Sequence, residues 1–424
     1  MSGSVSEKHS EKGVSSGWLL ILCWTVFTFS FLGQLSYAST STQIEGFFSV
    51  GHAETGAVMS FFYLAYGVGH VVNGLLCKKY PLRYVIFGAM AVTGLANFAI
   101  PMLPAGAFAV HKYLWLVNGL AQSALWPLLI RLLSETLDDK ELSKANVVMG
   151  TTVCTGTLLT YGGSALFVSL GFFQGMFITA GVIALCVAVV WLLAFPKLTA
   201  GFGGAEQGRG EASGEGICLQ NSGKGLSTLV LFFLCAIALL AVCNNVIKEG
   251  LIVWMPAILR ETYEIPDWST LLLTMVLPLL GAFAVVVAVG LYNKIPNFFV
   301  ELAILYGVSG GLLGVVLGLL STNLLAVTVA GFGLVAMLMS AVNGVITSMI
   351  PLYMREKLGN SGMIAGVLNG FCYVGSTISS YGLGALAEGS GWTAVFVLFI
   401  VLCAFSVLLG GAGAIVQRRK QDAR

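Results

Sequence analysis

The chain has 424 residues, of which 57% are hydrophobic and only 9% are charged. Soluble domains carry roughly 25% charged residues, so this composition excludes a soluble globular protein. Lys and Arg total 21 against 19 Asp and Glu, and the nine cysteines, most of them in apolar runs, show no metal or disulfide spacing. The sequence therefore predicts neither a nucleic-acid partner nor a metal site.

The first apolar run covers residues 18–37 and follows a polar tail, residues 1–17. About 20 residues span the roughly 30 Å hydrocarbon core of a bilayer as a helix. Ser36-Tyr37-Ala38 also loosely fits a signal-peptide cleavage site, which is the alternative interpretation of this run. Because more spans of the same kind follow, we expect the first helix to be retained.

Charges, prolines and short polar turns divide the chain into twelve apolar spans. They are residues 18–37, 55–77, 84–103, 113–133, 145–169, 172–195, 226–259, 269–292, 298–320, 324–350, 362–387 and 392–416. An even number of spans places both termini on one side. All basic residues except Lys112, Lys248 and Arg260 fall on that side or in its loops. We therefore expect a multi-pass protein of the cytoplasmic membrane with both termini cytoplasmic.

Residues 196–225 are rich in Gly, Ser and Glu and show no helix or strand periodicity, which indicates a cytoplasmic linker. It separates two halves, residues 18–195 and 226–416, and a second tail covers residues 417–424. The halves resemble each other: TGTLLTYGG from Thr155 is similar to VGSTISSYGLG from Val374. The predicted fold is an all-α membrane protein of two pseudo-symmetric six-helix bundles, with its site at the interface between the repeats.

Polar side chains recur on one face of several spans at helical spacing. These candidates for solute binding are Gln34, Tyr37, Tyr63, Tyr66, His70, Asn118, Gln122, Trp126, Asn343, Asn369 and Tyr373. The third, sixth, ninth and twelfth spans carry few polar residues, so we expect them to face lipid. The alternative is that the polar faces only hold helices together, and for His70 we also weigh a packing role.

Charge lies deep in one place, at Lys248 and Glu249 in the seventh span. Asn244 and Asn245 just before them are further candidates for solute binding. Such a charge costs about 2.5–3.5 kcal/mol on insertion scales unless it faces a cavity or a partner. Lys248 is therefore expected to bind an anionic group of the solute, and the alternative is that Glu249 neutralises it. Adjacent helical residues diverge by about 100°, so we expect the two not to face each other. Glu249 is the candidate for ion coupling.

The sequence has no glycine-rich GKS or GKT phosphate loop, no Ser-His-Asp elbow and no His/Cys/carboxylate cluster. We expect no enzyme activity and no cofactor.

Several segments resemble the major facilitator superfamily and, within it, the organophosphate:phosphate antiporters. They are AYGVGHVVNGLL (65–76), NGLAQSALWP (118–127), KEGLIVWMP (248–256) and AGVLNGFCYVGSTIS (365–379). The resemblance implies that Lys248 replaces a phosphate-binding arginine, that Tyr66 is a cavity tyrosine and that His70 replaces a basic residue. The chain departs from the pattern near Leu35 and Ser36, which lack an arginine, near Val153, which replaces a histidine, and at Lys78, which replaces an acidic residue.

These features predict a secondary active transporter that moves a small polar, anionic solute, either an organophosphate or a carboxylate, by alternating access. A coupling ion or counter-substrate is expected as its partner, with the lipid bilayer around a monomer. The alternative is a transporter-like membrane sensor of a sugar phosphate.

Overall fold

The computed structural model describes residues 3–76, 79–200, 228–353 and 361–422. These ranges form helices and no strand. Ten stretches of the described chain are long and apolar enough to cross a membrane. The last of them, Ile364–Arg418, holds two helices because the chain turns at Gly391, which has a φ of 75°. With α7 (Asp139–Ser169) as a further long helix, the described ranges account for the twelve predicted spans.

The first bundle contains the helices up to α8. They are α1 (Gly3–Ser39), α2 (Ser41–Phe48), α3 (His52–Leu76), α4 (Leu82–Ala99), α5 (Val110–Gln122), α6 (Leu125–Thr136), α7 and α8 (Gln174–Thr199). The expected tail 1–17 is largely part of α1, and α8 runs into the predicted linker 196–225 before the described range ends at residue 200. Most of that linker lies outside the described residues.

The second bundle contains the helices from α9 onward. They are α9 (Thr228–Tyr263), α10 (Asp267–Thr274), α11 (Val276–Gly281), α12 (Ala284–Lys294), α13 (Phe298–Leu319), α14 (Leu325–Gly344) and α16 (Ser361–Asp422). Local sequence sets some of the ends: the Asn297 side chain accepts the N–H groups of Phe299 and Val300 and so caps α13. Directly after α14 the chain forms a π-helix at Val345–Met349.

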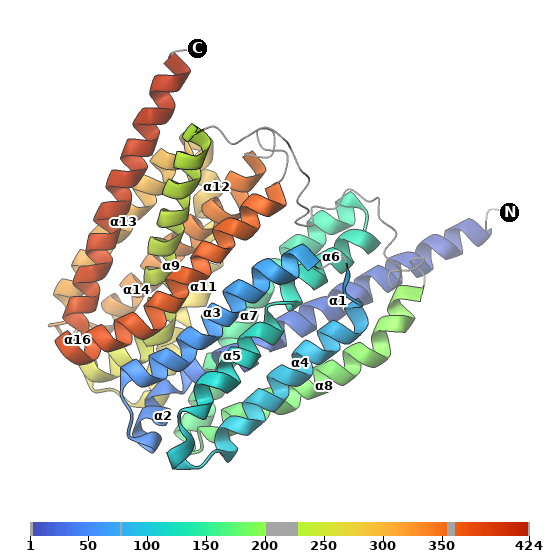
Figure 1. The fold of residues 1–424 in the computed structure, drawn as a ribbon, viewed down its shortest axis with the longest axis horizontal. Coiled ribbons are helices and arrows are strands. Elements are labelled where there is room, and N and C mark those ends of the chain that lie inside the picture. The colour runs from blue at the N-terminus through green and yellow to red at the C-terminus, as the bar shows by residue number, and fades with distance from the viewer. Residues whose placement is uncertain (1–2, 77–78, 201–227, 354–360, 423–424) are drawn as a thin grey trace.

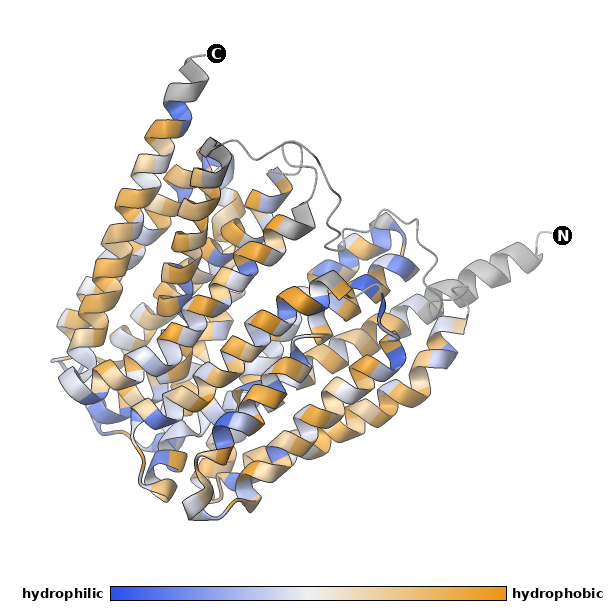
Figure 2. Ribbon diagram, in the orientation of Figure 1, coloured by the Kyte–Doolittle hydropathy of each residue, from blue (hydrophilic) through white to orange (hydrophobic). Residues whose placement is uncertain are grey.

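The two bundles lie side by side and diverge toward the end that carries both termini (Figure 1). The main contacts between bundles are those of α3 with α16 and of α7 with α10, whereas α4, α8 and α13 pack mainly within their own bundles. Hydrophobic residues run along the helices and hydrophilic ones gather mostly toward the two ends of the molecule (Figure 2). This distribution fits an apolar band around the middle of the protein.

Candidate functional site

Polar residues of α3 and α16 meet halfway along the contact between the bundles. The rings of Tyr66 and Tyr373 have centroids 4.8 Å apart, and His70 Nε2 lies 3.4 Å from Asn369 Nδ2. The helices approach closely here because Gly67 has no side chain: a Cβ at this position would lie 2.6 Å from the Cβ of Tyr373. The polar faces predicted for these two spans therefore face each other.

Lys248 and Glu249 form an ion pair beside this contact, with 2.9 Å between Lys248 Nζ and Glu249 Oε1. The expectation that adjacent residues do not face each other was wrong. Their Cβ atoms diverge, but both side chains are long enough to turn toward each other, and a charge in a low-dielectric region gains most from an opposite charge. Across the bundle interface, the Tyr63 hydroxyl donates to Glu249 Oε2 at 3.3 Å.

Amide groups of the second bundle surround the pair. Asn245 Nδ2 donates to the carbonyl oxygen of Ala241 at 3.0 Å and lies 3.4 Å from Asn343 Oδ1. Asn343 Oδ1 is also 3.6 Å from Cys372 Sγ. Asn244 is fully buried, and neither of its side-chain polar atoms has a hydrogen-bond partner in the described ranges. A buried amide without partners is costly, so Asn244 is suited to a ligand or a water molecule.

Taken together, these side chains form what we call the central polar cluster. It consists of Tyr63, Tyr66, His70, Asn244, Asn245, Lys248, Glu249, Asn343, Asn369, Cys372 and Tyr373. Gln34 of α1 adds to it through a side-chain hydrogen bond with Tyr63. The Lys248 and Glu249 side chains are 18% and 14% exposed, so the charged centre is shielded but accessible.

Four predicted site residues are placed elsewhere, inside the first bundle. Asn118 Nδ2 donates to the Gly33 carbonyl at 2.9 Å, and Gln122 Nε2 donates to Asn118 Oδ1 at 2.9 Å. Tyr37 and Trp126 are also turned into this bundle. The Tyr37 hydroxyl lies 3.0 Å from His111 Nδ1, and the ring of Trp126 packs against Phe27. These hydrogen bonds and ring contacts join helices of one bundle, and a role of the four residues at the solute site stays a prediction.

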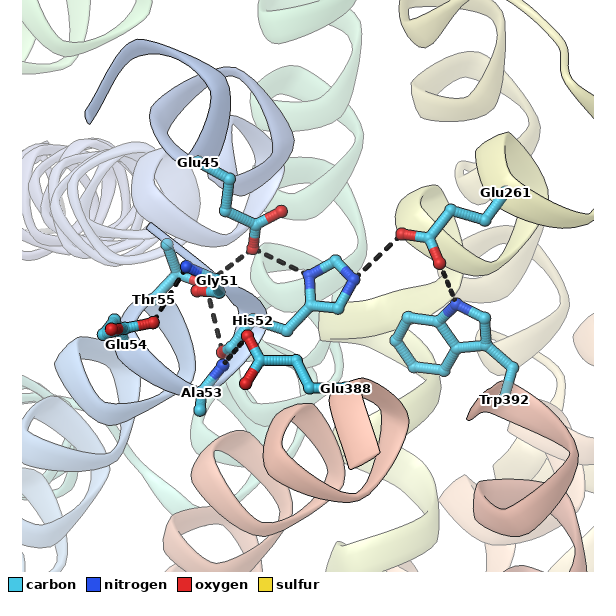
Figure 3. A network of polar contacts seen from close by, with 9 residues as sticks. All are labelled: Glu45, Gly51, His52, Ala53, Glu54, Thr55, Glu261, Glu388 and Trp392. Atoms are coloured by element: carbon cyan, nitrogen blue, oxygen red, sulfur yellow. Dashed lines mark hydrogen bonds and ion pairs between the residues drawn. The ribbon is translucent and has the colours of Figure 1, made fainter. Parts of the chain in front are cut away.

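A second polar group between the bundles was missed by the sequence reasoning. At the end opposite the termini, His52 of α3 contacts Glu45 of α2 and Glu261 of α9 (Figure 3). The available signal was a histidine and several glutamates at span ends on the side with few basic residues. Among the described residues, no group of three or more His, Cys, Asp or Glu side chains is arranged to hold a metal ion.

Comparison with known proteins shows the family of this chain. The sequence profile described as "Major Facilitator Superfamily" matches residues 16–380. The "Voltage-gated purine nucleotide uniporter SLC17A9" of Rattus norvegicus is 29% identical over 142 residues, 32% of this chain and 32% of that protein. "Protein spinster homolog 1" of Rattus norvegicus is 26% identical over 106 residues, 25% of this chain and 19% of that protein. The matched segments thus span about a third and a fifth of these relatives.

Solved structures share the fold over nearly the whole length. A bacterial homolog to the human lysosomal transporter Spinster, inward-facing and unoccupied, aligns with a TM-score of 0.69 at 14% identity, covering 93% of this chain and 97% of that one. The same homolog in its inward-facing and occupied conformation gives a TM-score of 0.70 at 12% identity, covering 95% and 97%. At this level of identity the likeness concerns the fold.

Proposed function

The chain belongs to the major facilitator superfamily, and from this premise we propose that it is a secondary active transporter of a small anionic solute. The proposed solute site is the central polar cluster, where Lys248 meets the anionic group and the amides and tyrosines meet its polar groups. We further propose that the protein lies in the cytoplasmic membrane as a monomer with both termini cytoplasmic. In the structure the bundles are joined at the end opposite the termini (Figure 1), so with cytoplasmic termini this conformation is inward-facing.

The observation that carries this proposal is the ion pair of Lys248 and Glu249 at the bundle interface. An ion pair buried among membrane helices is expensive and marks a solute or proton pathway by default. Tyr63 of the other bundle contacts Glu249 at 3.3 Å, so a change in charge at the pair alters a contact between the bundles. Rocking of the bundles around such a site opens it to one side of the membrane and then to the other.

Coupling follows from the same two residues. In this conformation Glu249 neutralises Lys248. A proton on Glu249 removes that partner, and an anion entering the cluster then replaces it, so the site takes up one proton and one negative charge together. Charge in the low-dielectric centre stays balanced in both states. We therefore propose proton–anion symport among the possible coupling modes.

The substrate class is a small anion with hydroxyl or other hydrogen-bonding groups, either an organophosphate or a carboxylate such as a sugar acid. Tyrosine hydroxyls and asparagine amides suit such groups. One relative is named for purine nucleotides, which are also anions, although its match covers 32% of this chain. With a single lysine in the cluster, a singly charged group is better matched than a doubly charged one.

Uptake into proteoliposomes tests the proposal. An inward-directed proton gradient is applied to vesicles that contain the purified protein. Labelled sugar phosphates and sugar acids serve as probes. Losing a charge-assisted contact costs about 1.5–3 kcal/mol, so Lys248→Gln should weaken anion binding about ten- to a hundred-fold. Glu249→Gln should keep anion exchange across the membrane but lose accumulation driven by the pH gradient.

Lys144→Gln is the matched control, because Lys144 is an exposed cation at the termini end of α7 and should be dispensable. Normal uptake by Lys248→Gln would show that Lys248 serves only as the structural partner of Glu249. Saturable binding without accumulation of any probe would instead favour the transporter-like sensor of a sugar phosphate.

A further inference from the structure

His52, the first residue of α3, lies between two carboxylates at the end opposite the termini (Figure 3). Its Nδ1 is 3.0 Å from Glu45 Oε1, which belongs to the same bundle. Its Nε2 is 2.9 Å from Glu261 Oε1, which belongs to the other bundle. Each ring nitrogen of His52 therefore faces a carboxylate oxygen, and the ring bridges the two bundles.

This geometry selects the protonated ring. A neutral imidazole carries one N–H and can donate only one hydrogen bond, whereas the imidazolium donates two. The rings of Trp254 and Trp392, which belong to the other bundle, pack against His52 with centroids 5.4 Å from that of its ring. The two contacts with carboxylates thus favour His52 with two N–H groups.

Other charged groups at this end do not replace the proton. They are Glu54 on α3, Lys112 on α5, Arg260 on α9, Glu264 directly after α9, Asp267 on α10 and Glu388 on α16. Arg260 Nε is 3.1 Å from Asp267 Oδ1, so this cation is directed to another acid. Glu388 accepts the N–H of Ala53 at 3.1 Å, and Glu54 accepts that of Gly51 at 2.8 Å. Acidic groups prevail around His52, which again favours a positive ring.

Separating the bundles changes the surroundings of the ring. Glu45 would stay with His52, and a hydrogen bond from Thr55 at 2.7 Å holds it in place. Glu261, Trp254 and Trp392 all belong to the other bundle and would move away together, since the Trp392 indole donates to Glu261 Oε2 at 2.7 Å. His52 therefore binds a proton more tightly when the bundles are joined, and by linkage the proton favours the joined state.

We propose that His52 is a proton-dependent latch that binds a proton from the water at the end opposite the termini and holds the two bundles together there. The Glu261 side chain is 43% exposed, whereas that of His52 is 15% exposed, so water reaches the ring from the Glu261 side. Acid on that side favours the joined state and alkali favours its opening. Because the proton enters and leaves on one side, the latch regulates the opening without carrying protons across.

Distance measurements between the bundles test the latch. Spin labels attached without cysteine chemistry at Gly106 and Asn323, both exposed and on different bundles, report the separation at this end in vesicles without solute. Raising the pH from about 6 to about 9 crosses the range in which a histidine without carboxylate partners loses its proton, so the proton ceases to be available to the separated state and its linkage to the joined state weakens. The wild type should shift about tenfold toward the longer distance, as expected for one lost charge-assisted contact.

Variants separate the latch from a merely structural contact. His52→Gln should favour the longer distance at every pH, and His52→Lys, which keeps the charge, should favour the shorter one. Glu261→Gln should lose the pH response. His111→Gln is the matched control: His111 contacts Tyr37 within the first bundle at 3.0 Å, and its removal should leave the response intact.

A wild-type distance that is independent of pH would overturn the proposal, as would a normal pH response in His52→Gln. If His52→Gln fails to fold, the other two variants test the proposal. A normal pH response in Glu261→Gln, or a longer distance in His52→Lys, would also overturn it. The measurement uses no solute, so its outcome is independent of the proposed anion transport.

Discussion

At the scale of single residues, the same amide group serves two purposes in this protein. Asn118 is fully buried, donates to the Gly33 carbonyl at 2.9 Å and accepts from Gln122. Asn343 lies in the central polar cluster, 3.4 Å from Asn245. Both appeared in the sequence as polar residues on a helix face. Their partners in the folded chain suggest a packing role for the first and solute contact for the second.

Truncation of each amide distinguishes these roles. Hydrogen bonds between membrane helices contribute about 0.6–1.7 kcal/mol, so Asn118→Ala should lower the thermal unfolding temperature while the concentration for half-maximal uptake stays unchanged. Asn343→Ala should raise that concentration with little effect on unfolding. If Asn118→Ala loses uptake without losing stability, Asn118 takes part in solute binding.

At the scale of helices, closure at the end opposite the termini depends on glycines where α3 crosses α16. A Cβ at Gly384 would lie 2.6 Å from the carbonyl oxygen of His52, and one at Gly56 would lie 2.2 Å from that of Ser380. These distances are too short for any side chain, so the backbones must separate if one is added. Small residues allow membrane helices this close approach.

Gly384→Ala should therefore favour the open form of this end at every pH, since overpacking costs about 1–3 kcal/mol. The spin-label distance between Gly106 and Asn323 measures the change. Gly88→Ala is the control, because a Cβ at Gly88 of α4 meets nothing within 4 Å. An unchanged distance in Gly384→Ala would mean that the contact of α3 with α16 does not limit opening.

At the scale of the whole molecule, the bundles diverge toward the termini (Figure 1), so a water-soluble reagent should reach the central polar cluster from that side. In a background with the nine native cysteines replaced, cysteine at position 343 or 369 should react with a membrane-impermeant thiol reagent added on the termini side. Cysteine in place of the fully buried Ser406 of α16 should not react. Equal rates at all three positions, or reaction only from the other side, would contradict this arrangement.

The sequence by itself determined the fold class and the approximate positions of the apolar spans. The predicted run 298–320 corresponds to α13 (Phe298–Leu319), and the predicted break between 387 and 392 contains the turn at Gly391. These features follow from bilayer thickness and backbone chemistry, which act along the chain. A spanning segment must be helical and apolar over a fixed length whatever its neighbours are.

Only the tertiary structure decided which polar groups meet. The sequence indicated that Lys248 and Glu249 lie deep in the membrane, but their pairing depends on the side-chain torsions that bring Nζ to 2.9 Å from Oε1. His52 and Glu261 are 209 positions apart and come together only because the bundles join at that end. Such contacts depend on which helices pack together and at what height, and the hydrophobic period of a single span does not encode this.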